Sequence, residues 1–322
     1  MKDDKKLKVS LIIPTKDRPE DLVMCLKSAS KQTLLPDEII IVDSSKEENS
    51  IRIKELLKSL DKNMITKIFY FHVSKQSLTF QRNYGIKRSS GDIIVFVDDD
   101  TILDKDFLLQ IVYVFNKFSN ENIGGVSGNL IERDELKGTS LFHKFINIIY
   151  QIYTTIFFLP RYKNGMFLPS GFPTLIKKNT NKIVETEFLH GGCSAFKRKV
   201  FDIFKFDENL NGYGSREDVD FSYRVSRQFK NYWTPYAKII HNRSLQSRSE
   251  LKIIKDKLKN SVYLFHKNFK EASFFQIFCF YWAFFGMFVL ETIKLITRLF
   301  VRKIMEVGKN SRERTYMPKN HI

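Results

Sequence analysis

Short apolar runs followed by polar turn residues recur through the first third of the chain. They cover residues 7–13, 38–42, about 66–72 and 93–97. An apolar run of this length between turn residues is typical of a strand that is buried on both faces of a parallel sheet. We therefore predict four strands here, with Pro14-Thr15 ending the first of them.

Helix-like patterns separate these strands. Asp17 is placed to cap the first helix, with Glu20 three residues later. We expect further helices over about 47–60, 77–89 and 104–118. The regular alternation of strands and helices predicts an α/β fold with a doubly wound, mostly parallel sheet.

Three adjacent carboxylates, Asp98, Asp99 and Asp100, follow the fourth strand. They repel one another and lose hydration there, and a divalent cation with oxygen ligands compensates for both effects. Thr15 and Asp43 follow the first two strands, so parallel strands would bring these side chains to one edge of the sheet, where α/β proteins bind ligands. The alternative is an acidic turn in which one Asp caps the next helix and the others are solvated.

The alternation becomes irregular after a strand that begins near Gly124. Residues 141–160 are rich in Phe, Ile and Tyr. This pattern fits a buried helix and an amphipathic segment at a membrane surface equally well. A strand returns at 190–196, where Gly191 and Gly192 either allow close backbone approach to a ligand or form a simple turn.

Three acids, Glu217, Asp218 and Asp220, crowd the first turn of a helix that follows a glycine-rich loop. A carboxylate at a helix N-terminus is usually a cap, but this arrangement also suits a positioned base on a movable loop. A strand over about 232–240 then leads to His241. At the acid-bearing edge of the sheet this imidazole is a candidate metal ligand, although a lone His is more often an ordinary surface or core residue.

The last part of the chain has a different composition. Residues 272–290 are uncharged and rich in aromatic side chains, and their roughly 28 Å of helix is borderline for crossing a bilayer. Residues 293–304 mix apolar and basic side chains as in an amphipathic helix on an anionic surface, and a helix that coats a soluble domain is the alternative. We therefore divide the chain into a domain at 1–250, with an aromatic insert at 135–185, and a membrane-associating helical region with a basic tail at 251–322.

Composition narrows the choice of partner. The 322 residues are 43% hydrophobic and 28% charged, which supports a sizeable core, and the net charge of +17 implies an anionic partner such as nucleic acid, an anionic membrane or a phosphorylated substrate. The late clustering of aromatics beside Lys and Arg favours a membrane. Three widely separated cysteines and the lack of an apolar leader predict reduced thiols in a cytosolic chain.

With these motifs the chain resembles family 2 glycosyltransferases, inverting enzymes with a nucleotide-sugar-binding GT-A fold. The resemblance covers about residues 7–245 in the expected order. The segments that carry it are weak singly and specific together: Val9–Thr15 with Asp17-Arg18, Ile41–Ser45, Gln81–Gly85, Asp98–Asp100 and Gly214–Asp218.

The resemblance implies roles for individual residues. Asp98 and Asp100 match the Asp-x-Asp motif that holds Mn²⁺ or Mg²⁺, and His241 matches a late metal ligand of some relatives. The metal would neutralise charge on the departing nucleoside diphosphate. Asp218 matches the general base that deprotonates the acceptor hydroxyl, with Glu217 in support. The residues that the resemblance places in nucleotide-sugar binding are Pro14, Thr15, Arg18, Asp43, Arg82, Asp98 and Asp99.

The implied function is metal-dependent, inverting transfer of a sugar from a nucleotide-sugar donor to a surface polysaccharide or lipid-linked glycan, at the cytoplasmic face of a membrane and without nucleic acid as a partner. Three alternatives remain. A nucleotidyltransferase would need a Gly- and Lys-rich loop where Pro14–Asp17 stands. A nucleic-acid-binding protein would show exposed basic stripes, whereas here the basic residues are spread along the chain. A membrane-tethered pseudoenzyme is the third, and the presence of Asp98, Asp100 and Asp218 argues against it.

Overall fold

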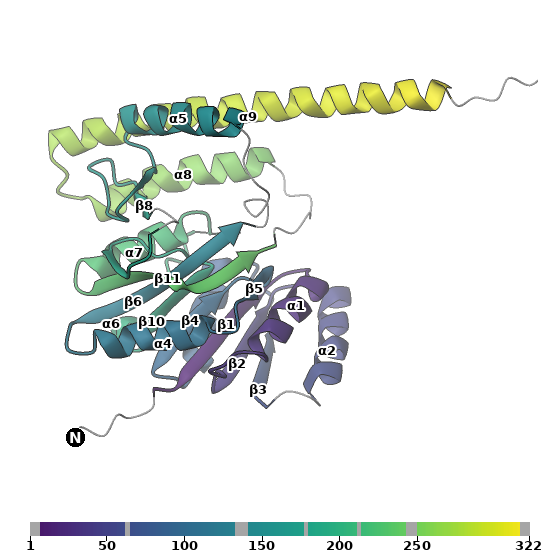
Figure 1. Ribbon diagram of the computed structural model, residues 1–322, viewed down its shortest axis with the longest axis vertical. Helices are drawn as coiled ribbons and strands as arrows, with labels where there is room; N and C mark the ends of the chain where they lie inside the picture. The colour runs from purple at the N-terminus through teal and green to yellow at the C-terminus, as the bar shows by residue number, and fades with distance from the viewer. Residues whose placement is uncertain are drawn as a thin grey trace, which may run out of the picture.

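The computed structural model describes residues 7–61, 65–132, 141–176, 180–210, 214–242 and 250–315. Gly212 and Tyr213 of the glycine-rich loop, part of the insert at 135–185 and the tail after residue 315 lie outside the described residues. Figure 1 shows a twisted sheet flanked by helices, with a separate layer of helices at one end of the molecule.

Four parallel strands form one half of the sheet, in the spatial order β3 (Lys67–His72), β2 (Glu38–Asp43), β1 (Val9–Thr15) and β4 (Ile93–Val97). They confirm the four strands predicted from the apolar runs. The expectation that Pro14-Thr15 ends the first strand is wrong, because β1 continues through both residues. β1 pairs with β4 only as far as Ile12, so Pro14 lies where the strand is paired on one side, and its missing N–H is tolerated there.

Four helices follow these strands along the chain: α1 (Pro19–Ala29), α2 (Glu47–Asp61), α3 (Leu78–Arg88) and α4 (Phe107–Lys117). The capping role predicted for Asp17 is wrong, because Arg18 occupies the cap position of α1 and its side chain makes no capping hydrogen bond. Asp17 Oδ1 instead accepts hydrogen bonds from the Lys46 N–H and from Asn49 Nδ2 near the start of α2. Its φ of 56° is a left-handed conformation that Asp adopts more readily than most residues.

The other half of the sheet continues beyond β4 with β10 (Cys193–Lys197), β6 (Ile123–Glu132), β11 (Lys230–His241) and β5 (Thr101–Leu103), and β9 (Val184–Thr186) pairs with β11. β10 runs antiparallel to β4 and β6, whereas β11 runs parallel to β6. β1, β2, β4 and β11 therefore end at the same edge of the sheet, and β10 begins there. The fold is α/β with a mostly parallel sheet, as predicted.

Successive residues of a central strand point to opposite faces of the sheet, so the apolar runs supply two cores. Leu11 and Ile13 of β1 join a cluster on the face covered by α1, α2 and α4. Ile12 joins a second cluster on the face covered by α3, α6 (Val200–Ile203) and α7 (Glu217–Ser226). The three cysteines are buried free thiols, as predicted.

Three helices form the layer at the end of the sheet. α8 (Glu250–Asn268) packs against α9 (Phe274–Thr315), and α5 (Leu141–Ile156) lies beside α9 (Figure 1). A third apolar cluster joins them and includes Leu159 and Phe280. The short strands β7 (Tyr162–Lys163) and β8 (Leu175–Ile176) pair with each other in the segment after α5.

The interpretation of residues 141–160 as a buried helix is wrong. A helix forms there, but the side chains of Phe145, Ile148 and Ile152 are more than half exposed. In the part of the chain that the structure describes, one segment is long and apolar enough to cross a membrane, Phe274–Thr297 in α9. In its most apolar stretch, 33% is buried inside the protein. Both α5 and α9 therefore keep many apolar side chains at the surface.

Candidate active site

The three aspartates after β4 lie at the edge of the sheet where β1, β2 and β11 also end, and two of them face the loop after β1. The Thr15 hydroxyl donates a hydrogen bond to Asp99 Oδ2 over 2.7 Å. Arg18 Nη1 lies 2.9 Å from Asp99 Oδ1 and 3.0 Å from Asp100 Oδ2. The predicted convergence of these side chains at one edge of the sheet is confirmed.

Asp99 and Arg18 form the buried base of this edge. Their side chains are 6% and 8% exposed. Burial raises the pKa of Asp99 to about 7, with Arg18 and the Thr15 hydroxyl opposing the change and the charges of Asp98 and Asp100 adding to it. Because both oxygens of Asp99 contact protein groups, this carboxylate holds the loop after β1 in place. Its direct contact with a nucleotide sugar stays a prediction.

Asp98, Asp100 and His241 form a candidate metal site. One ligand atom from each side chain lies within 4.8 Å of the others, and His241 Nε2 lies 3.1 Å from Asp100 Oδ1. Carboxylate oxygens are the ligands that Mn²⁺ and Mg²⁺ prefer. The donor set and its spacing therefore fit a single divalent cation held between β4 and β11.

Arg82 of α3 connects this site to the start of α7. Its Nη1 lies 2.7 Å from Glu217 Oε2, and its Nη2 donates to the Gly191 carbonyl over 3.1 Å and lies 3.6 Å from Asp98 Oδ1. The side chain is 2% exposed. Arg82 thus holds two carboxylates of the site in fixed positions. Contact between Arg82 and the nucleotide stays a prediction.

Glu217 and Asp218 begin α7 and have different surroundings. Glu217 is buried, and this burial raises its pKa to about 8, opposed by Arg82 and increased by the charges of Asp218 and Asp98. Asp218 is half-buried, and its Oδ2 accepts a hydrogen bond from the Gly191 N–H over 3.3 Å. Of the two carboxylates, Asp218 is the one that a substrate could reach.

The two glycines before β10 bring the backbone against the site carboxylates. A Cβ atom on Gly192 would lie 2.5 Å from Asp98 Oδ2, and one on Gly191 would lie 2.7 Å from Glu217 Oε1. The close approach that these glycines permit is therefore to side chains of the site. A larger residue at either position would displace a carboxylate.

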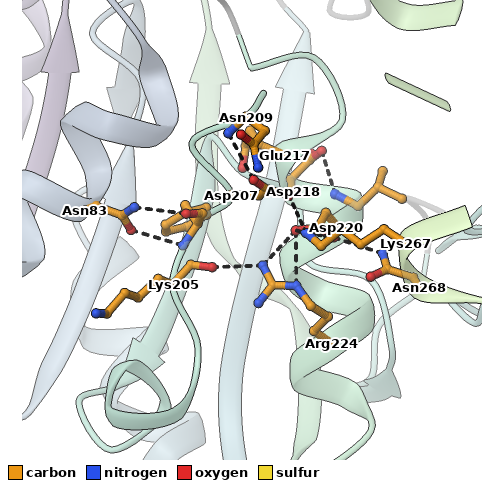
Figure 2. A network of polar contacts seen from close by, with 12 residues as sticks. Asn83, Lys205, Asp207, Asn209, Glu217, Asp218, Asp220, Arg224, Lys267 and Asn268 are labelled. Carbon is orange, nitrogen blue, oxygen red and sulfur yellow. Dashed lines mark hydrogen bonds and ion pairs between the residues drawn. The ribbon is translucent and has the colours of Figure 1, made fainter. Parts of the chain in front are cut away.

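Asp220, the third acid at the start of α7, binds three side chains that the sequence did not single out. Asp220 lies 2.7 Å from Arg224 Nη2 of the same helix, and Lys267 Nζ and Asn268 Nδ2 of α8 each lie 2.9 Å from its other oxygen (Figure 2). These contacts fix the helix that carries Asp218. No sequence pattern joins Asp220 to α8, since only the fold brings these segments together.

Asp43 and Pro14 complete the residues predicted to line a nucleotide pocket. Asp43 is fully buried at the end of β2, and its carboxylate accepts hydrogen bonds from the Tyr70 hydroxyl over 2.6 Å and from the Ser45 N–H over 2.7 Å. Burial and the bond to Asp43 raise the pKa of Tyr70. Both predicted residues lie at the site edge, and their contact with a nucleotide stays a prediction.

Comparison with known proteins decides the family. The sequence profile of glycosyl transferase family 2 matches residues 10–204, more than half of the chain. The chain belongs to glycosyltransferase family 2.

Two curated relatives illustrate the similarity. The chain is 23% identical over 209 residues to the O-antigen chain rhamnosyltransferase RfbN of Salmonella typhimurium, covering 64% of this chain and 56% of RfbN. It is 30% identical over 128 residues to the GalNAc(5)-diNAcBac-PP-undecaprenol beta-1,3-glucosyltransferase of Campylobacter jejuni, covering 39% of this chain and 40% of that protein. The chain thus spans less than two thirds of the length of these relatives.

Two solved structures share the fold. GalNAc-T7, solved with UDP, GalNAc and Mn²⁺, matches with a TM-score of 0.59 at 17% identity and covers 82% of this chain and 48% of its own. The mannosyltransferase PcManGT of Pyrobaculum calidifontis, solved with GDP-Man and Mn²⁺, matches with a TM-score of 0.53 at 13% identity and covers 92% of this chain and 80% of its own. These similarities confirm the predicted GT-A-type fold.

Proposed function

We propose that the chain is a metal-dependent, inverting glycosyltransferase that moves a sugar from a nucleotide-sugar donor to an acceptor hydroxyl. The observation that carries this proposal is the grouping of Asp98, Asp100 and His241 next to Arg82, whose other side meets the start of α7. A metal-ligand set and an accessible carboxylate that lie close together are the two parts that a one-step sugar transfer needs.

The metal would bind through the oxygens of Asp98 and Asp100 and the nitrogen of His241. A nitrogen ligand favours Mn²⁺ over Mg²⁺, which is bound almost entirely by oxygen. When bound, the ion would neutralise the charge that develops on the departing nucleoside diphosphate. GalNAc-T7 and PcManGT were both solved with Mn²⁺, which supports this assignment.

Asp218 would accept the proton of the acceptor hydroxyl as the hydroxyl oxygen attacks the anomeric carbon. One displacement of this kind, from the side opposite the leaving group, inverts the anomeric configuration. The hydrogen bond from the Gly191 N–H would hold the Asp218 carboxylate in position at the start of α7. Glu217, buried and paired with Arg82, would keep the start of the helix in position.

Thr15, Arg18 and Asp43 would line the nucleotide side of the site. One relative is named for an O-antigen chain and another for an undecaprenol-linked glycan. We infer the same general class of acceptor for this chain, a surface polysaccharide or lipid-linked glycan, and a location at the cytoplasmic face of a membrane, to which the region after residue 250 would attach.

The test is consumption of a panel of UDP-, GDP- and dTDP-sugars by the full chain, with lipid-linked glycans as acceptors and with either Mn²⁺ or a chelator. One donor class should release its nucleoside diphosphate only when metal and acceptor are both present, and the product should have the anomeric configuration opposite to that of the donor. Retention of configuration would contradict the single displacement. Folded protein that consumes none of the donors and binds none of their nucleotides would contradict the proposal as a whole.

A further inference from the structure

Helix α9 carries two apolar stripes on opposite sides. Phe280, Ala283 and Met287 recur at three- to four-residue spacing and are buried. Exposed aromatic residues recur at the same spacing on the other side of the helix, and they are about half exposed or more: Phe274, Phe278, Tyr281, Phe285 and Phe288. A helix on the surface of a soluble domain has only the first stripe. The second stripe faces away from the protein and needs a separate explanation.

Helix α5 adds a second apolar surface beside the first. Phe145, Ile148, Ile152 and Ile156 are each more than half exposed and lie about one turn apart. This helix belongs to the aromatic insert and stands more than a hundred residues before α9, so its proximity is a property of the fold alone.

The two helices are firmly joined. Trp282 Nε1 donates to the Ile156 carbonyl over 2.9 Å, and the Tyr153 hydroxyl donates to the Gly286 carbonyl over 2.7 Å. The residue numbers rise on α9 as they fall on α5, so the helices are antiparallel neighbours (Figure 1). The Phe157 ring stacks on Trp282 with 4.9 Å between centroids. The exposed apolar side chains of α5 and α9 therefore form one surface.

Helix α9 cannot stand upright in a bilayer while it keeps these contacts. Its 42 residues span about 63 Å, roughly twice the thickness of the hydrocarbon core. It packs lengthwise on α8, from the stacked rings of Phe265 and Phe280 to the ion pair of Lys257 and Glu291 at 2.6 Å. α8 is rich in Lys, and charged side chains are costly in hydrocarbon. The helix pair therefore has to lie flat.

We propose that α5 and α9 form a two-helix platform that lies in the plane of an anionic membrane, with its apolar side inserted at the boundary between headgroups and acyl chains. Interfacial helices combine such an apolar side with basic flanks. The chain matches this pattern, because neither α5 nor residues 274–290 of α9 contain an acidic residue. Arg161 follows α5, and Lys294, Arg298 and Arg302 lie further along α9. A second copy of the chain on the same face would bring these basic flanks together.

The platform and the adjoining helix α8 also contact the loop that leads into α7. Arg216 Nη2 lies 3.1 Å from the Met287 sulfur of α9, and Asn260 Nδ2 of α8 donates to the Ser215 carbonyl over 2.9 Å. These contacts place the start of α7 next to α9, on the side of the helix that faces the protein. The inference deepens the membrane location stated in the proposed function, but the experiments below do not use sugar transfer as their readout, so either can fail alone.

The first experiment is flotation of the full chain with phosphatidylcholine vesicles that contain or lack phosphatidylglycerol. We expect binding that increases with the anionic lipid. The double variants Ile148→Ser/Ile152→Ser in α5 and Phe278→Ser/Phe285→Ser in α9 should each lower vesicle partitioning about tenfold or more. Ile203→Ser in α6 is the matched control, because Ile203 and Ile152 are both 56% exposed, and it should leave partitioning unchanged.

The second experiment measures the depth of Trp282 with brominated lipids. The chain has two tryptophans, and Trp233→Phe leaves Trp282 as the single reporter. Quenching should be strongest with bromines about 5–10 Å below the headgroups.

Strongest quenching at the bilayer centre would show a spanning helix and overturn the proposal. Binding that the α5 variant leaves intact would overturn the joint platform. If the chain ignores vesicles and the same substitutions convert a dimer into a monomer by light scattering, the face is a contact between two copies and the proposal is wrong.

Discussion

The sheet edge and the helical layer depart from ordinary burial in opposite directions. At the sheet edge, Arg82, Asp99 and Glu217 are charged or titratable groups inside the protein, whereas in the helical layer Phe145 and Phe274 are large apolar groups outside it. Each arrangement is unfavourable in water without compensation. At the sheet edge the compensation is internal, through the ion pairs of Asp99 with Arg18 and of Glu217 with Arg82, the Thr15 hydroxyl and the Gly191 carbonyl. In the helical layer the described residues leave the outer apolar face exposed, and we propose that the membrane supplies its compensating surroundings.

The largest expected effect tests the reactive group at the sheet edge. Asp218→Asn should lower kcat by about 10²–10⁴ because the base is lost, and nucleotide affinity should stay within about twofold since the amide oxygen can still accept from Gly191. Steady-state kinetics and nucleotide titration measure the two quantities. Equal losses of turnover and nucleotide affinity would remove Asp218 from the role of base.

Arg82→Met tests the internal compensation. It leaves Glu217 buried without its ion-pair partner at 2.7 Å, so above pH 8, where the Glu217 carboxyl is ionised, the free energy of unfolding should fall by about 3 kcal/mol. Arg88→Met is the control on the same helix, where the arginine is exposed, and it should change this quantity by less than about 0.5 kcal/mol. Urea denaturation compares the two, and similar values would mean that the buried pair does not stabilise the fold.

Two neighbouring residues of α9 sharpen the contrast between inner and outer faces. Met287 is 2% exposed and Phe288 is 51% exposed. In detergent-free buffer, Met287→Ala should cost about 2 kcal/mol of unfolding free energy, while Phe288→Ala should cost under about 0.5 kcal/mol although it removes the larger side chain. A larger cost at Phe288 would show that the outer stripe packs against protein.

The smallest expected effect concerns pH. Burial raises the pKa of Glu217 to about 8, above its unfolded value of about 4.3. A carboxyl group whose pKa rises on folding favours the folded state at low pH, and this contribution is lost as pH rises through about 8. Between pH 6 and pH 8 without metal, the wild type should lose about 1–2 kcal/mol more stability than Glu217→Gln. Parallel pH profiles from urea denaturation would contradict the buried, raised-pKa carboxyl.

Much of the sheet could be predicted because its signals are local. Apolar runs of strand length predicted β1 to β4, and a ligand-binding edge beyond parallel strands brought Thr15, Asp99 and Asp100 together. His241 could be predicted as a metal ligand because it ends a strand at that edge. Two local predictions were wrong, that β1 ends before Pro14 and that Asp17 caps α1. Both features depend on which neighbouring segment pairs with the backbone.

The remaining features depend on contacts between distant segments. Nothing in the sequence near Asp220 indicates Lys267, and nothing near Trp282 indicates Ile156. The same apolar pattern in residues 141–160 fits a core helix and a surface helix, because periodicity reports one apolar side and not what covers it. The structure decides between them, because Phe145, Ile148 and Ile152 of α5 are more than half exposed.

The most direct test of the candidate active site is thermal denaturation of the full chain with UDP, GDP and dTDP, each with Mn²⁺ or with a chelator. A ligand that binds the folded state alone raises Tm. One nucleotide should raise Tm only with Mn²⁺, and Asp100→Asn should abolish that rise while Asp104→Asn, an exposed aspartate nearby, retains it. A rise that persists with the chelator, or that survives in Asp100→Asn, would contradict a metal held by Asp98, Asp100 and His241.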